Sequence, residues 1–171
     1  MGKLYDEIDG KLRAWIEAQP LFFVATAPAA GGHVNVSPKG VSGTLEVRGP
    51  RAVAYVDLIG SGIETVAHLR ENGRITLMFC AFDGPPRIVR LYGTGRVEAA
   101  GGEVDGARAT VVVNVERIAD SCGYGVPLMA YEGERPQRLA WLEKQQRDGK
   151  LEAYVAEKNA ASIDGLPGLP T

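Results

Sequence analysis

The sequence predicts a mainly β fold with flanking helices, built as a small antiparallel barrel. Short apolar runs recur between residues 22 and 115 and are separated by turn residues such as Gly31-Gly32, Gly49-Pro50 and Asp83-Gly84. Helical patterns are confined to the two ends of this region and to one short segment after Gly60. About six or seven strands at such short spacing favour a closed barrel over a doubly wound sheet.

Length and composition predict one domain over residues 1–171. With 45% hydrophobic residues, the chain can bury a sizeable core. The net charge of -2 gives no field that favours nucleic acid or an anionic membrane, so neither is an expected partner. No apolar run approaches the roughly 20 residues of a membrane helix, and the first residues lack a signal peptide. Cys80 and Cys122 form neither a disulfide framework nor a metal motif, so we expect a reduced, cytoplasmic protein.

The first half of the chain begins with a predicted helix over residues 4–16. Leu4, Ile8, Leu12 and Ile16 recur every four residues and so lie on one face, and Pro20 ends the helix. A second helix is predicted from Ile63 to Glu71, before an Asn-Gly pair. The strands predicted in this half are 22–27, 33–37, 44–47 and 52–57.

The second half completes the barrel with strands at 75–80, 87–97 and 109–115, followed by helices at 136–147 and 150–159. A Gly-rich loop is predicted over 99–108. Both faces of the strands at 75–80 and 109–115 are apolar, so their outer faces need cover from a helix or a second subunit. We expect the C-terminal helices to supply part of that cover through Leu139, Trp141 and Leu142.

Two polar turns are the best candidates for an anion site. The strand at 33–37 alternates valines with Asn35 and Ser37 and ends in Ser37-Pro38-Lys39-Gly40. Gly60-Ser61-Gly62 precedes the helix that starts near Ile63. Glycines let backbone N–H groups approach a phosphate, the helix start adds positive potential, and Lys39 adds a charge. Each motif alone also fits an ordinary turn.

Other chemistry-bearing residues are sparse. His33 and His68 have no carboxylate or cysteine partners at ligand spacing, so we expect no metal site. Asp57 and Glu64 fit an acid–base pair or solvated carboxylates. The three arginines of the strand at 87–97 fit a solvated face or a phosphate contact. The sequence holds no nucleophile elbow, dinucleotide fingerprint or P-loop.

The order of these elements resembles the FMN-binding split barrels of the pyridoxamine 5'-phosphate oxidase-like family. The hairpin, the strand pair, the Gly-Ser turn with its helix and the strand led by Arg87-Ile88-Val89 follow in the same sequence, across residues 4–118. The segments 120–127 and 157–167 resemble a bacterial subgroup of that family. The resemblance implies a six-stranded antiparallel split barrel that forms a homodimer, with FMN at the subunit interface.

The resemblance also assigns cofactor-binding positions. They comprise the strand that touches the flavin ring, the end of the next strand, the phosphate turn, the start of the strand that closes the site, and a contribution from the partner chain. In that order they are Asn35, Val36, Ser37 and Lys39; Val56 and Asp57; Gly60, Ser61, Gly62 and Thr65; Arg87; and Lys158 and Asn159.

The implied function is an FMN-dependent oxidoreductase acting on a small molecule. The flavin would supply the redox chemistry, so no side chain must act as a nucleophile. The alternatives are a non-catalytic flavin carrier or sensor, and a structural dimer with a decayed ligand site. A deazaflavin or haem could replace FMN. Ser61-Gly62, with Thr65 near the lysine position, stands where the oxidase has a Ser-Arg-Lys clamp. Ile88 stands where a glutamine is often found, and the C-terminal Arg and His pattern of the oxidase is missing. We therefore expect a substrate other than pyridoxamine 5'-phosphate.

Overall fold

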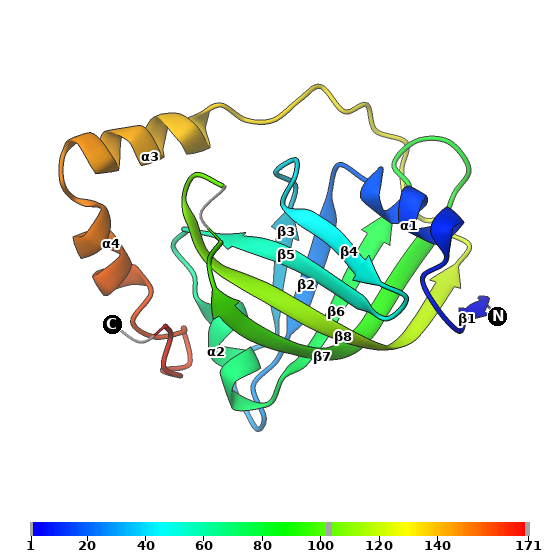
Figure 1. Cartoon of the computed structure of the whole chain (residues 1–171), viewed down its shortest axis with the longest axis horizontal. Helices are drawn as coiled ribbons and strands as arrows, with labels where there is room; N and C mark the ends of the chain where they lie inside the picture. The colour runs from blue at the N-terminus through cyan, green and yellow to red at the C-terminus, as the bar shows by residue number, and fades with distance from the viewer. Residues whose placement is uncertain (1, 102–103, 170–171) are drawn as a thin grey trace.

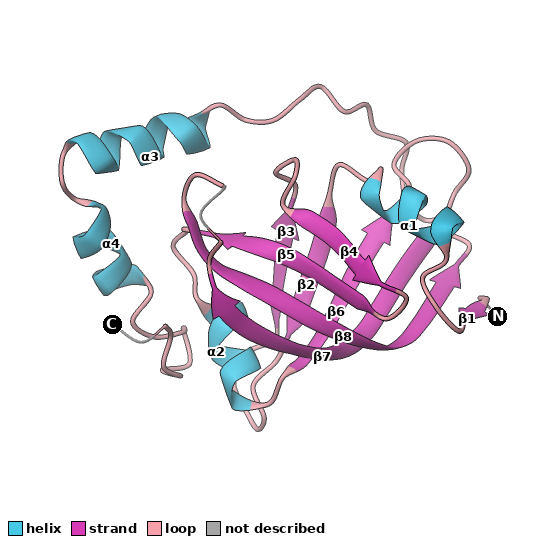
Figure 2. Ribbon diagram, in the orientation of Figure 1, coloured by secondary structure: helices cyan, strands magenta, loops and turns pink. Residues whose placement is uncertain are grey.

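The computed structural model describes residues 2–101 and 104–169, and within them the strands form one antiparallel sheet (Figure 1). The strand order is β3-β2-β6-β7-β8-β5-β4, and β1 pairs with β8 beside this path. The strands are β1 (Leu4–Tyr5), β2 (Phe22–Thr26), β3 (Asn35–Lys39), β4 (Leu45–Gly49), β5 (Ala52–Leu58), β6 (Arg74–Cys80), β7 (Ile88–Ala99) and β8 (Ala107–Ser121). The helices are α1 (Gly10–Glu17), α2 (Glu64–Glu71), α3 (Gln137–Arg147) and α4 (Leu151–Lys158). α1 and α2 lie against the strands, whereas α3 and α4 lie to one side (Figure 2).

The sheet curls into a split barrel and does not close. β3 and β4 stand at the two ends of the strand order, and no ladder between described residues joins them. The mainly β fold with flanking helices is confirmed, whereas closure of the barrel is not observed. The sheet has eight strands in place of the six implied by the resemblance, and one of them, β1, has only two residues.

The long strands β7 and β8 contain the bulge at which the sheet curves. Their register shifts between Tyr92 and Gly93, and a Cβ atom on Gly93 would overlap the backbone carbonyl oxygen of Asn114. Glycine at this position therefore permits the close approach of the two strands at the bulge. β8 begins at Ala107, before the predicted start at 109, and runs to Ser121, because its second half pairs with the start of β7. Residues 102–103 of the predicted loop lie outside the described residues.

The N-terminal helix is shorter than predicted. α1 starts at Gly10, because the Asp9 side chain caps it by accepting a hydrogen bond of 2.7 Å from the backbone N–H of Leu12. Leu4 and Tyr5 instead pair with the end of β8. The prediction of a helix from Leu4 was wrong because the four-residue spacing of Leu4 and Ile8 continued the pattern of α1 by coincidence.

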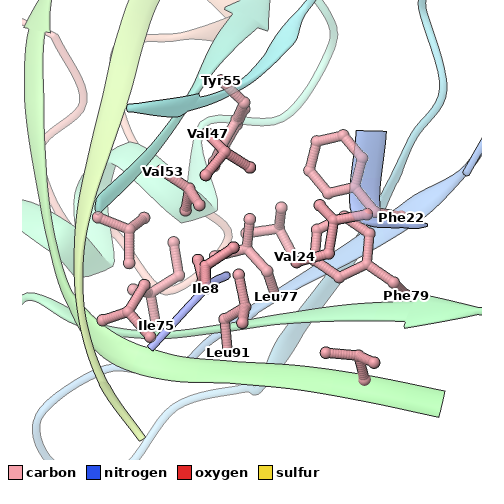
Figure 3. Packing of buried hydrophobic residues seen from close by; sticks show 14 of the residues in the cluster. Ile8, Phe22, Val24, Val47, Val53, Tyr55, Ile75, Leu77, Phe79 and Leu91 are labelled. Carbon is pink, nitrogen blue, oxygen red and sulfur yellow. The ribbon is translucent and has the colours of Figure 1, made fainter. Parts of the chain in front are cut away.

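The barrel interior is filled by apolar side chains (Figure 3). Phe22 stacks on Phe79, with ring centroids 5.5 Å apart, and meets Tyr55 edge to face at 5.6 Å. Val24, Leu77 and further aliphatic residues fill the rest of the interior. Because the centre is packed, space for a ligand remains at the margins of the barrel.

The C-terminal helices lie to one side of the barrel, after a long extended connection (Figure 1). Trp141 of α3 packs against Tyr154 of α4, and Leu142 packs at Gly106, in the loop before β8. Leu139 is 43% exposed. The prediction that these helices cover the sheet was wrong. Val112, on the outer face of β8, is nevertheless buried within the single chain. None of the helices in the described ranges is long and apolar enough to span a bilayer.

Candidate functional site

β3 presents its polar side chains inward and its valines to solvent. Asn35, Ser37 and Lys39 are half-buried, whereas Val36 is 60% exposed. The polar side chains bond to buried residues of β2, β5 and α2. Strands that pack on a core place apolar residues inward, so this strand has the reverse polarity. Such a reversal costs core burial and makes the inner face of β3 a candidate surface for a polar ligand.

Asp57 is the centre of a buried charge cluster. Its side chain is 0% exposed, and its two oxygens accept separate bonds: Oδ1 from Lys39 Nζ at 2.7 Å and Oδ2 from Arg108 Nε at 2.8 Å. Two cations around one carboxylate leave one positive charge in excess. Because buried charges are costly unless they are paired, this excess charge favours an anion beside the cluster.

The chain beyond α4 completes this cluster. Asn159 is buried; its Oδ1 accepts a bond of 3.0 Å from Arg108, and its Nδ2 donates to the carbonyl oxygen of Gly60 at 2.9 Å. Asn159 thereby joins the charge cluster to the glycine turn between β5 and α2. A Cβ atom on Gly168 would overlap the Asn159 carbonyl oxygen, so the returning tail packs tightly there.

The turn over 60–62 leads into α2, whose first turn carries Thr65. Ser61 is exposed and Thr65 is buried beneath Asn35, which donates to its hydroxyl at 3.0 Å. Glu64 is half-buried at the start of α2 and accepts a bond of 3.3 Å from the backbone N–H of Ile163. The positive end of α2 is therefore already partly occupied by a carboxylate. This leaves the Asp57 cluster as the stronger candidate for an anion site.

The tail is also held at the opposite side of α2. Asp164 accepts two bonds from His33, one from the ring at 2.6 Å and one from the backbone N–H at 2.8 Å. These bonds lower the pKa of Asp164 from its usual value. Arg70 donates to the carbonyl oxygen of Gly168. The segment 159–168 is thus attached through four of its residues, Asn159, Ile163, Asp164 and Gly168.

A second hydrogen-bonded group lies behind β3. Asn35 donates from Nδ2 to the hydroxyls of Thr26 and Thr65, at 3.2 and 3.0 Å, and accepts at Oδ1 from Ser37 at 3.1 Å. Thr26 is also bonded to Nδ1 of His68 at 3.0 Å. The Nε2 atom of His68 and the hydroxyl of Tyr55 are buried without a hydrogen-bond partner.

Arg87 lies away from these groups. It donates to the Tyr5 hydroxyl at 2.7 Å, lies 3.6 Å from Asp120 and covers the ring of Trp15 at 4.7 Å. These contacts tie β1 and α1 to the end of β8. Within one chain, Arg87 therefore serves the N-terminal packing and does not contact the other predicted site residues.

Most of the residues predicted for the site do come together. Asn35, Ser37, Lys39, Asp57, Gly60, Thr65 and Asn159 belong to the two hydrogen-bonded groups described above. Val36 faces solvent, Val56 donates its backbone N–H to Thr44 within the sheet, and Lys158 is exposed beside Glu157. Ser61 and Gly62 form the turn itself.

Sequence reasoning missed Arg108, Thr26 and His68. Arg108 directly precedes the apolar run at 109–115, and a charge at the start of a buried strand is a signal for it. Thr26 and His68 gave no comparable signal. No group of three or more His, Cys, Asp and Glu side chains within the described ranges gathers closely enough to hold a metal ion.

An open cavity of about 420 Å³ adjoins the Lys39 end of β3. Phe22 and Lys39 form its inner wall, and Met129 and Tyr131 of the extended connection contribute to its outer wall. Its size suits a small organic molecule.

Comparison with known proteins places the chain in a family. The family model described as pyridoxamine 5'-phosphate oxidase matches residues 8–146. The chain belongs to the pyridoxamine 5'-phosphate oxidase family. One relative is the pyridoxamine 5'-phosphate oxidase family protein ustO of Aspergillus flavus, which is 42% identical over 191 residues, covering 96% of this chain and 77% of that protein. The similarity thus includes most of the segment beyond residue 146, and the family resemblance extends to a fungal protein.

Solved structures agree on the fold. The crystal structure of HupZ from Group A Streptococcus superposes with a TM-score of 0.56 at 21% identity, covering 72% of this chain and 99% of that chain. A histidine-to-alanine variant of HupZ gives a TM-score of 0.55 at 23% identity, with 67% and 99% covered. These structures therefore share the fold of this chain over the aligned residues.

Proposed function

We propose that this protein is an FMN-dependent oxidoreductase acting on a small molecule. The observation that carries the proposal is the reversed polarity of β3, whose inward polar face ends at a buried cluster with one excess positive charge. The residues present fit the two ends of FMN, a phosphate dianion and a ring edge that offers and accepts hydrogen bonds. Membership of the family supports the same assignment.

The phosphate end fits the Asp57 cluster and the neighbouring glycine turn. Lys39 and Arg108 supply charge-assisted donors, and the backbone of the turn over 60–62 can approach an anion closely. Asn159 holds both parts together through Arg108 and Gly60. A ligand that lacks the phosphate would leave the excess positive charge uncompensated.

The ring end fits Asn35 and Ser37. A bound flavin supplies the electron transfer, so the protein contributes binding, orientation and exclusion of water. The cavity beside Lys39, with Phe22 and Tyr131 in its walls, would receive the substrate.

The working unit in this proposal is a homodimer. β3 is an edge strand whose Val36 is exposed, as is Val34 directly before it, and the connection between β8 and α3 exposes Leu128 and Tyr131. Exposed apolar side chains on an edge strand favour burial against a second copy. Lys158 is exposed and could reach the partner's site, whereas Asn159 acts within its own chain.

Calorimetric titration with FMN and riboflavin tests the phosphate site. We expect FMN to bind at least about 10-fold more tightly than riboflavin, because a charge-assisted bond contributes about 1.5–3 kcal/mol. The Lys39→Ala variant should lose most of this preference, whereas Lys11→Ala, an exposed lysine on α1, should keep it. Equal affinity of the wild-type protein for the two ligands would contradict the proposal.

Redox activity needs a separate measurement. The FMN complex is incubated without oxygen with a panel of small reductants that includes NADPH, and bleaching of the visible flavin band is followed. Bleaching faster than that of free FMN supports an oxidoreductase. Rates equal to those of free FMN for every reductant would favour a flavin carrier.

A further inference from the structure

His68 and Thr26 form a buried pair directly behind the polar face of β3. His68 is 0% exposed, and its Nδ1 lies 3.0 Å from the hydroxyl of Thr26, which is also buried. His68 follows Thr65 by three residues on α2, so the two side chains lie on one face of that helix. Its Nε2 atom has no partner. A buried ring with an unsatisfied atom costs stability, so its placement here calls for a role.

The single hydroxyl proton of Thr26 links His68 to Asn35. Thr26 has one proton to donate, and its oxygen is bonded both to Asn35 Nδ2 at 3.2 Å and to His68 Nδ1. An amide nitrogen only donates, so Thr26 accepts from Asn35. The Thr26 oxygen could also accept from a protonated Nδ1, but of the two atoms bonded to it only Nδ1 can take the hydroxyl proton, so we assign that proton to the bond with His68. Nδ1 is then an acceptor, and the neutral ring carries its proton on Nε2. Reversal of the Asn35 carboxamide would require a proton on Nδ1, because Thr26 would then donate to Asn35.

The orientation of the Asn35 carboxamide determines whether the site presents hydrogen-bond donors or acceptors to a ligand. Both Nδ2 protons of Asn35 are used, by Thr26 and Thr65, and Oδ1 accepts from Ser37. The groups that can still form a hydrogen bond with a ligand are the lone pairs on Asn35 Oδ1 and Ser37 Oγ. In this state the ring end of the site presents acceptors, which match an N–H group. The reversed carboxamide would donate to Ser37 and free its hydroxyl proton for the ligand.

We propose that His68 is a positioning residue, which acts through Thr26 to hold the Asn35 carboxamide in the direction that selects a ligand bearing an N–H group. For an isoalloxazine ring this group is the imide N3–H, and this identification rests on the proposed function. The coupling between His68 and Asn35 is independent of that function. His68 itself does not contact the ligand in this proposal.

Nitrogen-15 NMR of histidine-labelled protein without ligand tests the coupling. The His33→Gln background leaves a single histidine signal, because the chain has 2 histidines. We expect His68 to show an unprotonated, hydrogen-bonded Nδ1 and a protonated Nε2. Asn35→Asp replaces the amide donor with an acceptor, so Thr26 must donate to it and Nδ1 must become protonated. A protonated Nδ1 in the starting protein, or an unprotonated Nδ1 in folded Asn35→Asp, would overturn the proposal.

Conservative variants at Thr26 serve if Asn35→Asp does not fold. Thr26→Ser keeps the hydroxyl, so His68 should keep its tautomer. Thr26→Val has nearly the same shape but no hydroxyl, so the Nδ1 signal should move away from that of a hydrogen-bonded acceptor. An identical His68 signal in both variants would also overturn the proposal.

A ligand comparison tests the consequence for selectivity. The wild-type protein should bind FMN roughly 2- to 10-fold more tightly than 3-methyl-FMN, beyond the steric effect of the methyl group, as expected for one hydrogen bond. Thr26→Ser should retain the full preference for FMN over 3-methyl-FMN. Thr26→Val should lose the part of this preference that the hydrogen bond contributes. Equal discrimination in the two variants would contradict the role of His68. Absence of FMN binding in all proteins would contradict the proposed function and leave the NMR result to decide the coupling.

Discussion

The Nζ atom of Lys39 lies 2.7 Å from Oδ1 of Asp57, although the two residues belong to strands that share no ladder. β3 is an edge strand, and β5 pairs only with β4 and β8. The ion pair therefore spans the opening of the split barrel. Since Asp57 also holds Arg108, one carboxylate fixes the spacing of the two cations in the proposed phosphate site.

Replacement of Asp57 should destabilise the protein strongly. Asp57→Asn removes the negative charge and leaves Lys39 and Arg108 without a counter-ion in a buried setting. Loss of one partner from a buried ion pair typically costs about 3–5 kcal/mol in the free energy of unfolding. Urea denaturation measures this, with Glu46→Gln as a control that breaks an exposed pair with Arg48. A loss no larger than that of the control would show that the cluster is not a buried unit.

The contribution of Asp120 to stability should depend on pH. Burial raises the pKa of Asp120, but hydrogen bonds from the Tyr5 hydroxyl and the Lys3 backbone outweigh it and hold the pKa below the usual 3.8. Between these two values the unfolded chain binds more protons than the folded protein, so stability rises with pH. The contribution is fully present above pH 3.8 and is lost as the pH falls through the lower, folded value.

The Asp120→Asn variant checks this dependence. It should be less stable than the wild type at neutral pH, and the difference in unfolding free energy should shrink as the pH falls below that range. Asp83→Asn, an exposed residue in the β6–β7 turn, serves as the matched control. A difference that stays constant from pH 7 to acid would rule out the carboxylate as its source.

The protein should be a homodimer in solution. Sedimentation equilibrium at micromolar concentration should give twice the chain mass of 18.2 kDa. Val36→Lys places a charge on the exposed apolar edge and should shift the equilibrium towards monomer, whereas Leu4→Lys, equally exposed on β1, should not. A wild-type monomer that binds FMN with full affinity would contradict both the dimer and a shared site.

Pyridoxamine 5'-phosphate should be a poor substrate. Gly62 and Ile88 replace polar contacts of the oxidase, and its C-terminal arginine and histidine pattern is missing. Formation of the aldehyde product by the FMN-loaded protein measures this directly. A catalytic efficiency of about 10⁴ M⁻¹s⁻¹ or more, the usual range for enzymes, would show that another part of the chain binds the substrate.

Local sequence signals predicted the elements well. The helix predicted over 63–71 is observed as α2 from Glu64 to Glu71, because its apolar face and the Asn-Gly stop are local features. The hairpin strands are shifted by at most two residues. The N-terminal helix was predicted too long because the spacing of Leu4 and Ile8 continued the helical pattern past the Asp9 cap, which was not considered in the prediction.

Contacts between distant residues were harder to predict. Arg108 and Asp57 are 51 residues apart in the chain, and Thr26 and His68 are 42 apart. No local pattern records which side chains meet across the barrel. Arg87 illustrates the same limit: the family resemblance implied a ligand-site role for it, and within one chain its neighbours are Tyr5 and Asp120.

The hydrogen bonds of Asn159 can form only late in synthesis of the chain. Asp57, Arg108 and Gly60 leave the ribosome well before Asn159, which is 99 residues beyond Gly60. Arg108 therefore lacks its amide partner while the barrel is emerging, and the turn at Gly60 is not yet attached to the tail. A nascent chain stalled before residue 159 would represent this intermediate. In it the sheet can form, but the Arg108 guanidinium has no hydrogen bond to Asn159.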